Sequence, residues 1–275
     1  MPVKELPGIV LAPYGTLFPP ALATYDHIKK AYEHAFPGSA VRLAFTSFLM
    51  KKRLQEKEGI SVQSLAHVLE EMYDQGFEGV VIQSLQIVPG REFHQVAAMV
   101  QEWKGRKPAF SCLEVGLPLL SNLSDCQKVS SLLPALISGS SYRRDANEDK
   151  EAVLLVGHGT GHPADALYCL MSMVLKKEHK NVFLGTMEGF SGLPWIMAEL
   201  KSSGARVVRL MPFLLVAGGH AENDIFGQSP QSWKSSLQRV GYEVVVDFCG
   251  LGERAEIVSL FLEHTGDALK RMEKQ

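Results

Sequence analysis

Two histidines and one glutamate follow three separate apolar runs in the second half of the chain. His158 follows the run at 153–156 and has glycine on both sides, Glu188 follows the run at 182–184, and His220 follows an apolar run and two glycines. In open α/β sheets, ligands bind at the edge where the parallel strands end, so the three side chains are expected to lie close together. Two imidazoles and a carboxylate at this edge could hold a divalent metal or move protons.

Each of the three residues also has a structural alternative. His158 could cap the helix that follows it, and Glu188 could be an exposed carboxylate in a loop. Glu222 and Asp224 follow His220 closely, and the pattern favours them as residues that stabilise the start of the next helix. One of them could instead hold the His220 ring in place, as outer partners of metal-binding histidines do.

Two further patterns near His158 do not favour a site. His162 stands four residues after His158, but the paired metal histidines with this spacing lie on one helix, whereas His158 is expected on a turn. We therefore expect His162 at the start of the helix. The glycines 157, 159 and 161 have the wrong spacing for a dinucleotide fingerprint, and the acidic residue needed ~20 positions later is absent.

Apolar runs alternate with helical patterns along the whole chain, which favours parallel sheets built from βα units. Strands are expected at 8–12, 40–45, 79–83, 109–115, 152–156, 181–185, 206–212 and 243–248. Helices are expected at 21–36, 62–75, 93–103, 164–177, 193–203, 230–240 and 255–272. In the 62–75 helix, Leu65, Val68, Leu69 and Met72 share one face. Ser229 is expected to cap the 230–240 helix, with Pro230 at its first position.

The two halves of the chain resemble each other in sequence. The segment at 9–16 and the segment at 154–160 both run from apolar residues into x-Gly-Thr, and the segment at 80–90 parallels the one at 207–219. This indicates duplication of one four-stranded, doubly wound α/β unit. Halves of this kind usually face each other across a cleft that binds a ligand.

The predicted domains are an N-terminal α/β half at 1–137, a linker at 138–150 and a C-terminal α/β half at 151–275. The linker is inferred from a polar, charged segment that has no periodicity. The first half carries Tyr14 and Arg91 at the points where the second half carries His158 and His220. The chemistry is therefore expected on the C-terminal half.

Composition and charge exclude several classes of partner. A net charge of −2 argues against a general nucleic-acid binder, which is usually markedly basic. No apolar run approaches the ~20 residues that a membrane span needs, and the first residues do not resemble a secretory signal. The four cysteines form no C-x-x-C pair, so we expect reduced, structural thiols and a cytoplasmic protein with no membrane or nucleic-acid partner.

Several ordered motifs together resemble a known family of enzymes. They are Tyr14-Gly15-Thr16, Ala44-Phe45-Thr46-Ser47, Val81-Ile82-Gln83-Ser84-Leu85 with Pro89-Gly90, Gly157-His158-Gly159-Thr160, Glu188-Gly189, and Gly219-His220-Ala221 with Asn223-Asp224. With them, nearly the whole chain resembles the anaerobic sirohydrochlorin cobaltochelatases of the CbiK type, which are class II chelatases.

The resemblance implies an enzyme that inserts Co²⁺ into sirohydrochlorin in anaerobic cobalamin biosynthesis. It places the metal on His158, Glu188 and His220, with His158 also suited to accept a pyrrole proton. The metal is then a substrate, no organic cofactor is required, and a homo-oligomer is compatible with the family.

The carboxylates of sirohydrochlorin need donors. Backbone N–H groups of Gly159, Thr160 and Gly161 at a helix start are one expected source, and Tyr14 is expected at the matching strand end of the first half. The candidate cations are Lys51, Lys52, Arg53 and Arg91, for each of which a solvated surface charge is an equal alternative.

Three other functions remain open from the sequence. A sirohydrochlorin ferrochelatase or a nickel-inserting relative would use the same ligands, because Fe²⁺, Co²⁺ and Ni²⁺ all accept imidazole and carboxylate. A non-catalytic carrier of tetrapyrrole or metal would bind without turnover. A hydrolase or phosphotransferase with His158 as nucleophile is disfavoured, because no arginine neighbours His158 or His220 in sequence.

Overall fold

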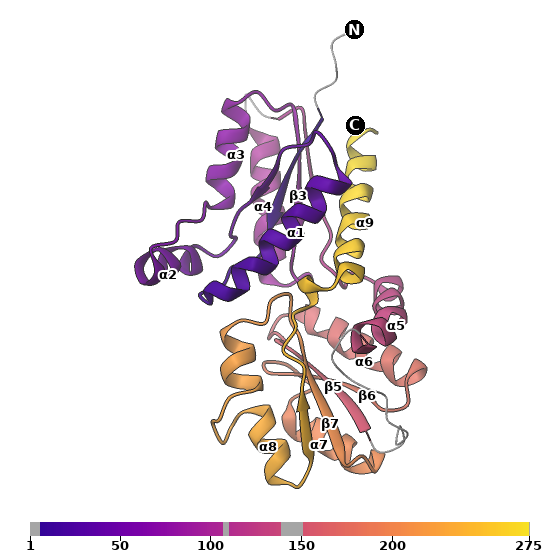
Figure 1. Ribbon diagram of the computed structural model, residues 1–275. Helices are drawn as coiled ribbons and strands as arrows, with labels where there is room; N and C mark the ends of the chain where they lie inside the picture. The colour runs from indigo at the N-terminus through magenta and orange to yellow at the C-terminus, as the bar shows by residue number, and fades with distance from the viewer. Residues whose placement is uncertain (1–5, 107–109, 139–150, 275) are drawn as a thin grey trace. The chain divides into compact units, whose positions relative to one another are not determined.

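A computed structural model describes residues 6–106, 110–138 and 151–274. The chain forms two compact units, one of residues 1–119 with 258–275 and the other of residues 120–257. Each unit has a four-stranded parallel sheet with helices around it (Figure 1). The prediction of two similar α/β halves is therefore confirmed.

The first unit has the strand order β2-β1-β3-β4. Its strands are β1 (Gly8–Ala12), β2 (Val41–Leu43), β3 (Gly79–Ser84) and β4 (Cys112–Gly116). Its helical elements are η1 (Pro19–Ala21), α1 (Leu22–Ala35), α2 (Phe48–Glu58), α3 (Leu65–Asp74), α4 (Arg91–Gly105) and most of α9 (Ala255–Met272).

The two faces of the first sheet are covered in different ways. One face packs against α3 and α4, and the four apolar residues predicted on one side of α3 are all buried there. On the other face, the Tyr32 hydroxyl donates to Thr265 Oγ1 at 3.0 Å, which donates to Gln83 Oε1 at 2.8 Å. Because an unpaired buried polar group costs free energy, these two linked hydrogen bonds fix how α1, α9 and β3 pack together.

The second unit repeats the topology with the order β6-β5-β7-β8. Its strands are β5 (Glu151–Gly157), β6 (Val182–Thr186), β7 (Val207–Phe213) and β8 (Glu243–Val246). Its helical elements are α5 (Leu123–Ser138), η3 (Pro163–Asp165), α6 (Ala166–Glu178), α7 (Leu193–Ser203), the π-helical turn η4 (Ala221–Ile225), α8 (Trp233–Arg239) and η5 (Leu251–Glu253).

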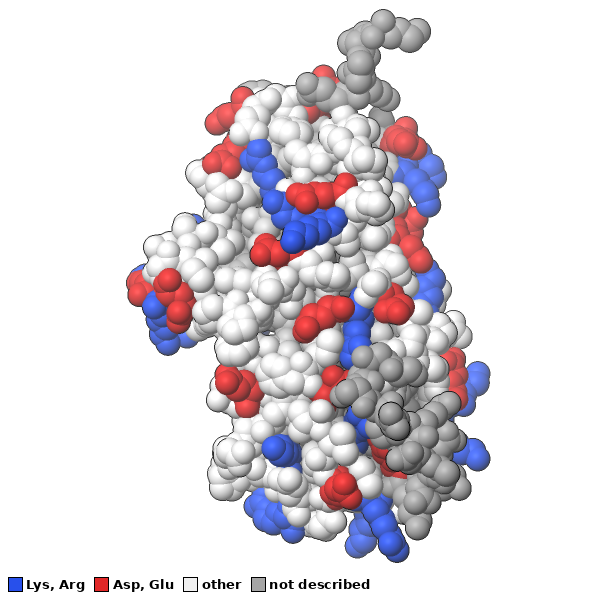
Figure 2. Space-filling view, viewed as in Figure 1, with Lys and Arg blue, Asp and Glu red and all other residues white. Residues whose placement is uncertain are grey.

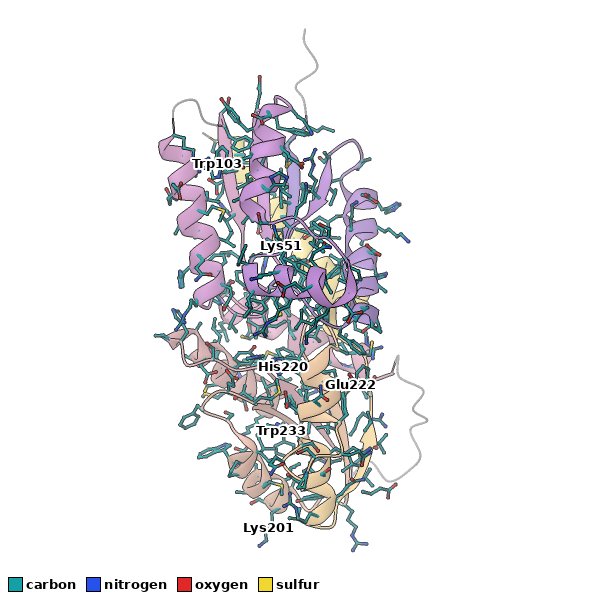
Figure 3. The ribbon with its side chains drawn as sticks, turned by 90° about the vertical axis from the view of Figure 1, so that its left-hand side faces the viewer. Lys51, Trp103, Lys201, His220, Glu222 and Trp233 are labelled. Carbon is teal, nitrogen blue, oxygen red and sulfur yellow. The ribbon has the colours of Figure 1, made fainter. Side chains whose placement is uncertain are left out.

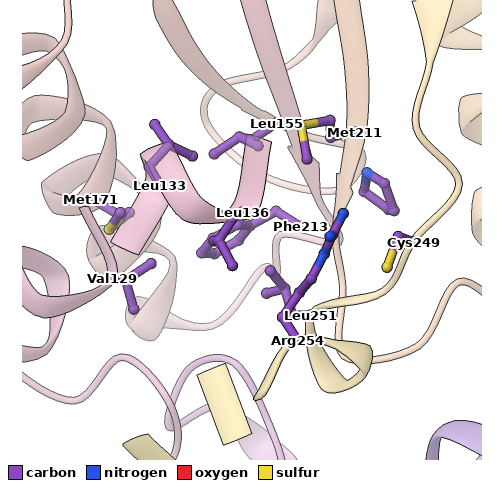
Figure 4. A pocket seen from close by; sticks show the side chains of 11 residues that line it. Val129, Leu133, Leu136, Leu155, Met171, Met211, Phe213, Cys249, Leu251 and Arg254 are labelled. Atoms are coloured by element: carbon purple, nitrogen blue, oxygen red, sulfur yellow. The ribbon is translucent and has the colours of Figure 1, made fainter. Parts of the chain in front are cut away.

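The second sheet is also covered on both faces. Ile196 of α7 and Trp233 of α8 belong to the core on one side of it. On the other side, Leu133 of α5, Met171 of α6 and Phe213 of β7 surround a small hollow (Figure 4). Its volume of about 10 Å³ is at the lower limit of what one water needs, so this hollow is too small for a larger ligand.

Two helices, α2 and α5, were not predicted, and the positions of α5 and α9 change the division of the chain. Only Leu54 of α2 is buried, so α2 shows no apolar period, and α5 contains Pro134. By sequence α5 belongs to the first half and α9 to the second, yet α5 lies in the second compact unit and most of α9 in the first. The units therefore differ from the expected halves at 1–137 and 151–275. Residues 139–150 of the expected linker lie outside the described residues.

The predicted start of the 230–240 helix is wrong. The helix begins at Trp233, and Ser232 caps it, since the Ser232 hydroxyl accepts the N–H of Ser235 at 3.1 Å. The same hydroxyl donates to the carbonyl of Gly227 at 2.7 Å. Ser232 thus has partners on both sides, and Ser229-Pro230 forms the turn before the helix.

The x-Gly-Thr motifs of the two halves form the same turn. Thr16 Oγ1 accepts the N–H of Phe18 at 3.1 Å, and Thr160 Oγ1 accepts the N–H of His162 at 3.1 Å. In both units a short 3₁₀ turn follows, η1 in the first and η3 in the second. The sequence parallel therefore corresponds to a repeated local structure.

The surface is mixed in charge. Figure 2 shows acidic and basic side chains interspersed over the visible face. Among the described residues, none of the helices combines the length and apolar character required to cross a bilayer.

Candidate active site

His158, Glu188 and His220 line one cavity of about 320 Å³ in the second unit. Strand β5 pairs with β6 on one side and β7 on the other, so the segments that follow these strands are neighbours. His158 directly follows β5, and the other two residues follow β6 and β7. The rest of the lining is Met187, Asn223, Asp224, Ser229, Gln231, Ser232 and Trp233. Figure 3 labels His220 and Trp233 in this unit.

The two imidazoles lie against each other. Their ring centroids are 4.9 Å apart and their planes are at 86°. His158 Nδ1 lies 3.1 Å from the carbonyl oxygen of Gly159. A carbonyl oxygen only accepts hydrogen bonds, so Nδ1 of the neutral ring carries the proton and Nε2 keeps its lone pair. His158 therefore presents a nitrogen suited to bind a metal or accept a proton.

His220 has a carboxylate behind its ring. Its Nδ1 lies 2.7 Å from Asp224 Oδ2, so this nitrogen donates and Nε2 is again the lone-pair atom. The contact forms because His220 directly precedes η4, a π-helical turn in which the N–H of Phe226 bonds to the carbonyl of Ala221. π-Helical turns are rare in proteins, and those that occur are often found at functional sites. Of the two acidic residues considered, Asp224 is the partner of His220.

Backbone hydrogen bonds join the segments that carry His158 and Glu188. The Glu188 N–H donates to the His158 carbonyl at 2.7 Å, and the Met187 N–H donates to that of Gly157 at 3.0 Å. Gly159 is required where the two segments meet. Its φ is +75°, and a Cβ there would lie 2.3 Å from the carbonyl oxygen of Glu188.

The first unit repeats this backbone arrangement without the chemistry. The Ser47 N–H donates to the Tyr14 carbonyl at 3.2 Å, which makes Tyr14 the equivalent of His158 and Ser47 the equivalent of Glu188. Neither residue offers an imidazole or a carboxylate. The two units thus share the backbone arrangement, and the different residues at the equivalent positions place the candidate chemistry in the second unit.

A buried tyrosine supports each glycine turn. Tyr168 is hydrogen-bonded to the backbone of Gly159, and Tyr25 to that of Gly15. Burial raises the pKa of both phenols well above its ordinary value, so both stay neutral. They act as fixed supports of the turns.

The residues expected to bind substrate carboxylates have varied surroundings. The Thr160 N–H already donates to Asp165 Oδ1 at 3.1 Å, so it is not free for a ligand in this arrangement. His162 accepts the N–H of Ala164 at its Nδ1 and starts η3, as expected. The other residues expected to bind substrate carboxylates lie in the first unit, and they are Tyr14, Lys51, Lys52, Arg53 and Arg91. Among them, Lys52 forms an ion pair in which its Nζ lies 3.7 Å from Glu56 Oε1.

The candidate ligands share a cavity without meeting at one point. Within 6–106, 110–138 and 151–274, no three His, Cys, Asp or Glu side chains are grouped closely enough to hold a metal ion. Glu188 is exposed, as is His220. A cation would therefore have to draw at least one of these side chains inward.

Comparison with known proteins identifies the family. The sequence profile of the cobalt chelatase (CbiK) family matches residues 7–270. This chain belongs to that family. It is 32% identical to sirohydrochlorin cobaltochelatase CbiKC of Nitratidesulfovibrio vulgaris, over 99% of this chain and 95% of the relative. It is 30% identical to the sirohydrochlorin cobaltochelatase of Salmonella typhimurium, over 82% of each.

Solved structures share the fold at low sequence identity. SirB from Bacillus subtilis, solved with Fe³⁺, has a TM-score of 0.67 at 12% identity and covers 98% of this chain and 97% of its own. CbiX, described as the terminal enzyme of sirohaem biosynthesis in denitrifying bacteria, has a TM-score of 0.58 at 13% identity, covering 95% and 99%. These likenesses establish a chelatase-like α/β fold.

In this cobalt chelatase family member, the structure adds two residues beside the candidate ligands. Asp224 could be found from its i,i+4 spacing after His220, but the sequence left it open between a cap and a partner. Asp165 bonds to the segment that follows Glu188, where its Oδ2 accepts the N–H of Phe190 at 2.9 Å. No sequence pattern marked this contact.

The contact of Asp224 with His220 predicts an effect on metal use. We expect Asp224→Ala to weaken Co²⁺ binding about 10–100-fold, the range usual for outer partners of metal-binding histidines. Isothermal titration with Co²⁺ measures it. Glu222→Ala, which removes an exposed carboxylate from the same turn, is the matched control. Equal losses in both variants would assign the effect to general charge and contradict the role of the hydrogen bond.

Proposed function

We propose that this chain inserts Co²⁺ into sirohydrochlorin and that His158, Glu188 and His220 handle the metal. The observation that carries the proposal is the cavity in which two imidazoles present Nε2 lone pairs beside a carboxylate. Membership of the cobalt chelatase family and the two cobaltochelatase relatives support the reaction. The bound metal is a substrate in this reaction.

The reaction exchanges two inner N–H protons of the macrocycle for one divalent cation, so charge is conserved. The single lone pair on His158 Nε2 can take a pyrrole proton once it no longer holds the cation, and both protons pass from there in turn to solvent, since Nδ1 is already committed to the Gly159 carbonyl. His220, held by Asp224, keeps a fixed ring orientation, as expected of a metal ligand. The exposed Glu188 carboxylate would partly neutralise the charge of the bound cation.

This ligand set does not by itself select cobalt. Imidazole and carboxylate suit Fe²⁺, Co²⁺ and Ni²⁺, so the geometry of the site and the supply of metal decide among them. SirB from Bacillus subtilis has also been solved with cobalt. Insertion rates for the three metals, compared without oxygen, would distinguish a cobaltochelatase from a ferrochelatase or a nickel-inserting enzyme.

The deciding experiment is anaerobic absorbance of the protein with sirohydrochlorin and Co²⁺. A protein-dependent change to the spectrum of the cobalt chelate supports the proposal. Binding of sirohydrochlorin without turnover would favour a carrier of tetrapyrrole or metal. Turnover that persists in a His158→Ala variant would move the reaction away from this cavity.

Glu188 is expected to act on the metal more than on the macrocycle. Glu188→Ala should raise the half-saturating Co²⁺ concentration at least about tenfold, because even an outer partner is worth this much. The KM for sirohydrochlorin should stay close to that of the parent chain. Steady-state kinetics with each substrate varied in turn measures both. A change in the KM for sirohydrochlorin with normal cobalt dependence would reassign Glu188 to substrate binding.

We place the reaction in the cytoplasm, in line with the cysteines. The four cysteines all lie in the described part of the chain, and none of them is joined to another by a disulfide. Burial raises the pKa of Cys126 and of Cys249 to about 11. Since the thiolate is the reactive form of cysteine, these two thiols are mainly in the unreactive protonated form near neutral pH.

A further inference from the structure

We propose that Asp165 is a positioning residue that holds the segments of His158 and Glu188 together, an inference that rests on the proposed function. Its two carboxylate oxygens accept one backbone N–H each, from Thr160 at 3.1 Å and from Phe190 at 2.9 Å. Thr160 lies two residues after one candidate ligand, and Phe190 two residues after the other. A single side chain thus bridges the two segments.

The contacts around Asp165 are close. A Cβ on Gly189 would lie 2.5 Å from Asp165 Oδ1 and 2.8 Å from Oδ2. The segment after Glu188 therefore passes directly over the carboxylate, and only glycine allows this approach. Together with the backbone bond from Glu188 to His158, the carboxylate ties the two segments on both sides of the candidate ligands.

The first unit shows that the fold does not need this carboxylate. Its turn after x-Gly-Thr has the same form, with the Ala21 N–H bonded to the Phe18 carbonyl at 3.0 Å, as the Asp165 N–H is to that of His162 at 2.9 Å. Ala21 is thus the equivalent of Asp165. The first unit has neither the imidazole of His158 nor the carboxylate of Glu188 at the equivalent positions, and it has alanine in place of Asp165. The carboxylate bridge therefore occurs with the candidate ligands and is not needed to form the turn.

The role of the carboxylate bridge follows from the arrangement of the candidate ligands in the cavity. Its candidate ligands share a space without converging on one point, so the arrangement of their backbones decides whether a cation can be held. Misplacement of reacting groups by about 1 Å can lower a rate about 100-fold. Asp165 is not among the residues that line the cavity, so it acts through the two segments and not on the metal.

The test uses Asp165→Ala, which gives the second unit the residue that the first unit has. We expect Co²⁺ affinity, measured by titration calorimetry, and kcat for insertion to fall about 10–100-fold. Sirohydrochlorin affinity should stay close to that of the parent chain, and the midpoint of thermal unfolding should fall modestly, because two backbone N–H groups lose their acceptor. Asp165→Asn keeps one carbonyl oxygen as an acceptor and should recover part of the loss.

Two controls keep the test specific. Asp125 is buried, and its Oδ2 accepts the N–H of Ser121 at 2.9 Å, so Asp125→Ala also removes a loop-holding carboxylate, from a residue outside the cavity lining. We expect it to lower stability without changing Co²⁺ affinity. Normal Co²⁺ affinity and kcat in Asp165→Ala, or an equal loss of Co²⁺ affinity in Asp125→Ala, would overturn the inference. Full activity of His158→Ala in the same assay would instead refute the proposed function.

Discussion

Replacement of His158 or His220 by alanine is expected to lower the rate of cobalt insertion by more than about 100-fold, beyond the usual cost of losing an outer partner. Each substitution removes one of the two Nε2 lone pairs in the cavity, and no other imidazole among the described residues lines it. The fold should persist, because the His220 side chain is 59% exposed and His158 is only partly buried. Anaerobic absorbance gives the rate, and circular dichroism reports on the fold.

The control for these substitutions is His162→Ala. His162 belongs to the same loop as His158 but caps η3 and does not line the cavity. It should retain most of the activity, with a small loss of stability of about 1 kcal/mol from the missing cap. Near-normal insertion in both His158→Ala and His220→Ala would remove this cavity from the mechanism.

Gly159→Ala is expected to have the second large effect, on stability as well as on activity. A non-glycine residue at a φ of +75° costs about 1–2 kcal/mol, and accommodating a Cβ 2.3 Å from the Glu188 carbonyl oxygen costs about 1–3 kcal/mol more. The backbone must move to relieve the contact, and the movement separates the segments of His158 and Glu188. We therefore expect a fall in the free energy of unfolding of about 2–5 kcal/mol, and a strong loss of insertion.

Gly161→Ala is the matched comparison for Gly159→Ala. A Cβ on Gly161 would have no neighbour within 4 Å, and its φ is not in the left-handed region. Denaturant unfolding and insertion kinetics should both stay close to those of the parent chain. If the two variants behaved alike, the close approach at Gly159 would not limit the site.

The sequence was most informative where one physical pattern dominated. The apolar runs of β1 and the helical patterns of α7 and α9 gave the observed bounds. A strand buried on both faces must be continuously apolar, and a long helix must repeat its apolar side, so these elements are encoded locally. His158, Glu188 and His220 were identified on the same basis, because strand ends of a parallel sheet meet at one edge.

Contacts that depend on the exact path of the folded backbone were not accessible in this way. The cap of α8 depends on the carbonyl of Gly227 as well as on Ser232. The placement of α5 in the second unit depends on the face of the sheet that its Leu133 covers. Neither contact leaves a period or a motif in the chain.

The sequence by itself therefore determined the repeated α/β architecture, the family and the residues with suitable chemistry, because these depend on residue type and short-range spacing. Only the tertiary structure decided that His158 and His220 face each other at 4.9 Å, that Asp224 holds His220, and that Asp165 bridges two segments. The contact between the two imidazoles and the bridge of Asp165 to Phe190 exist only once β5, β6 and β7 lie side by side. The contact of Asp224 with His220 depends on the π-helical turn that begins after His220.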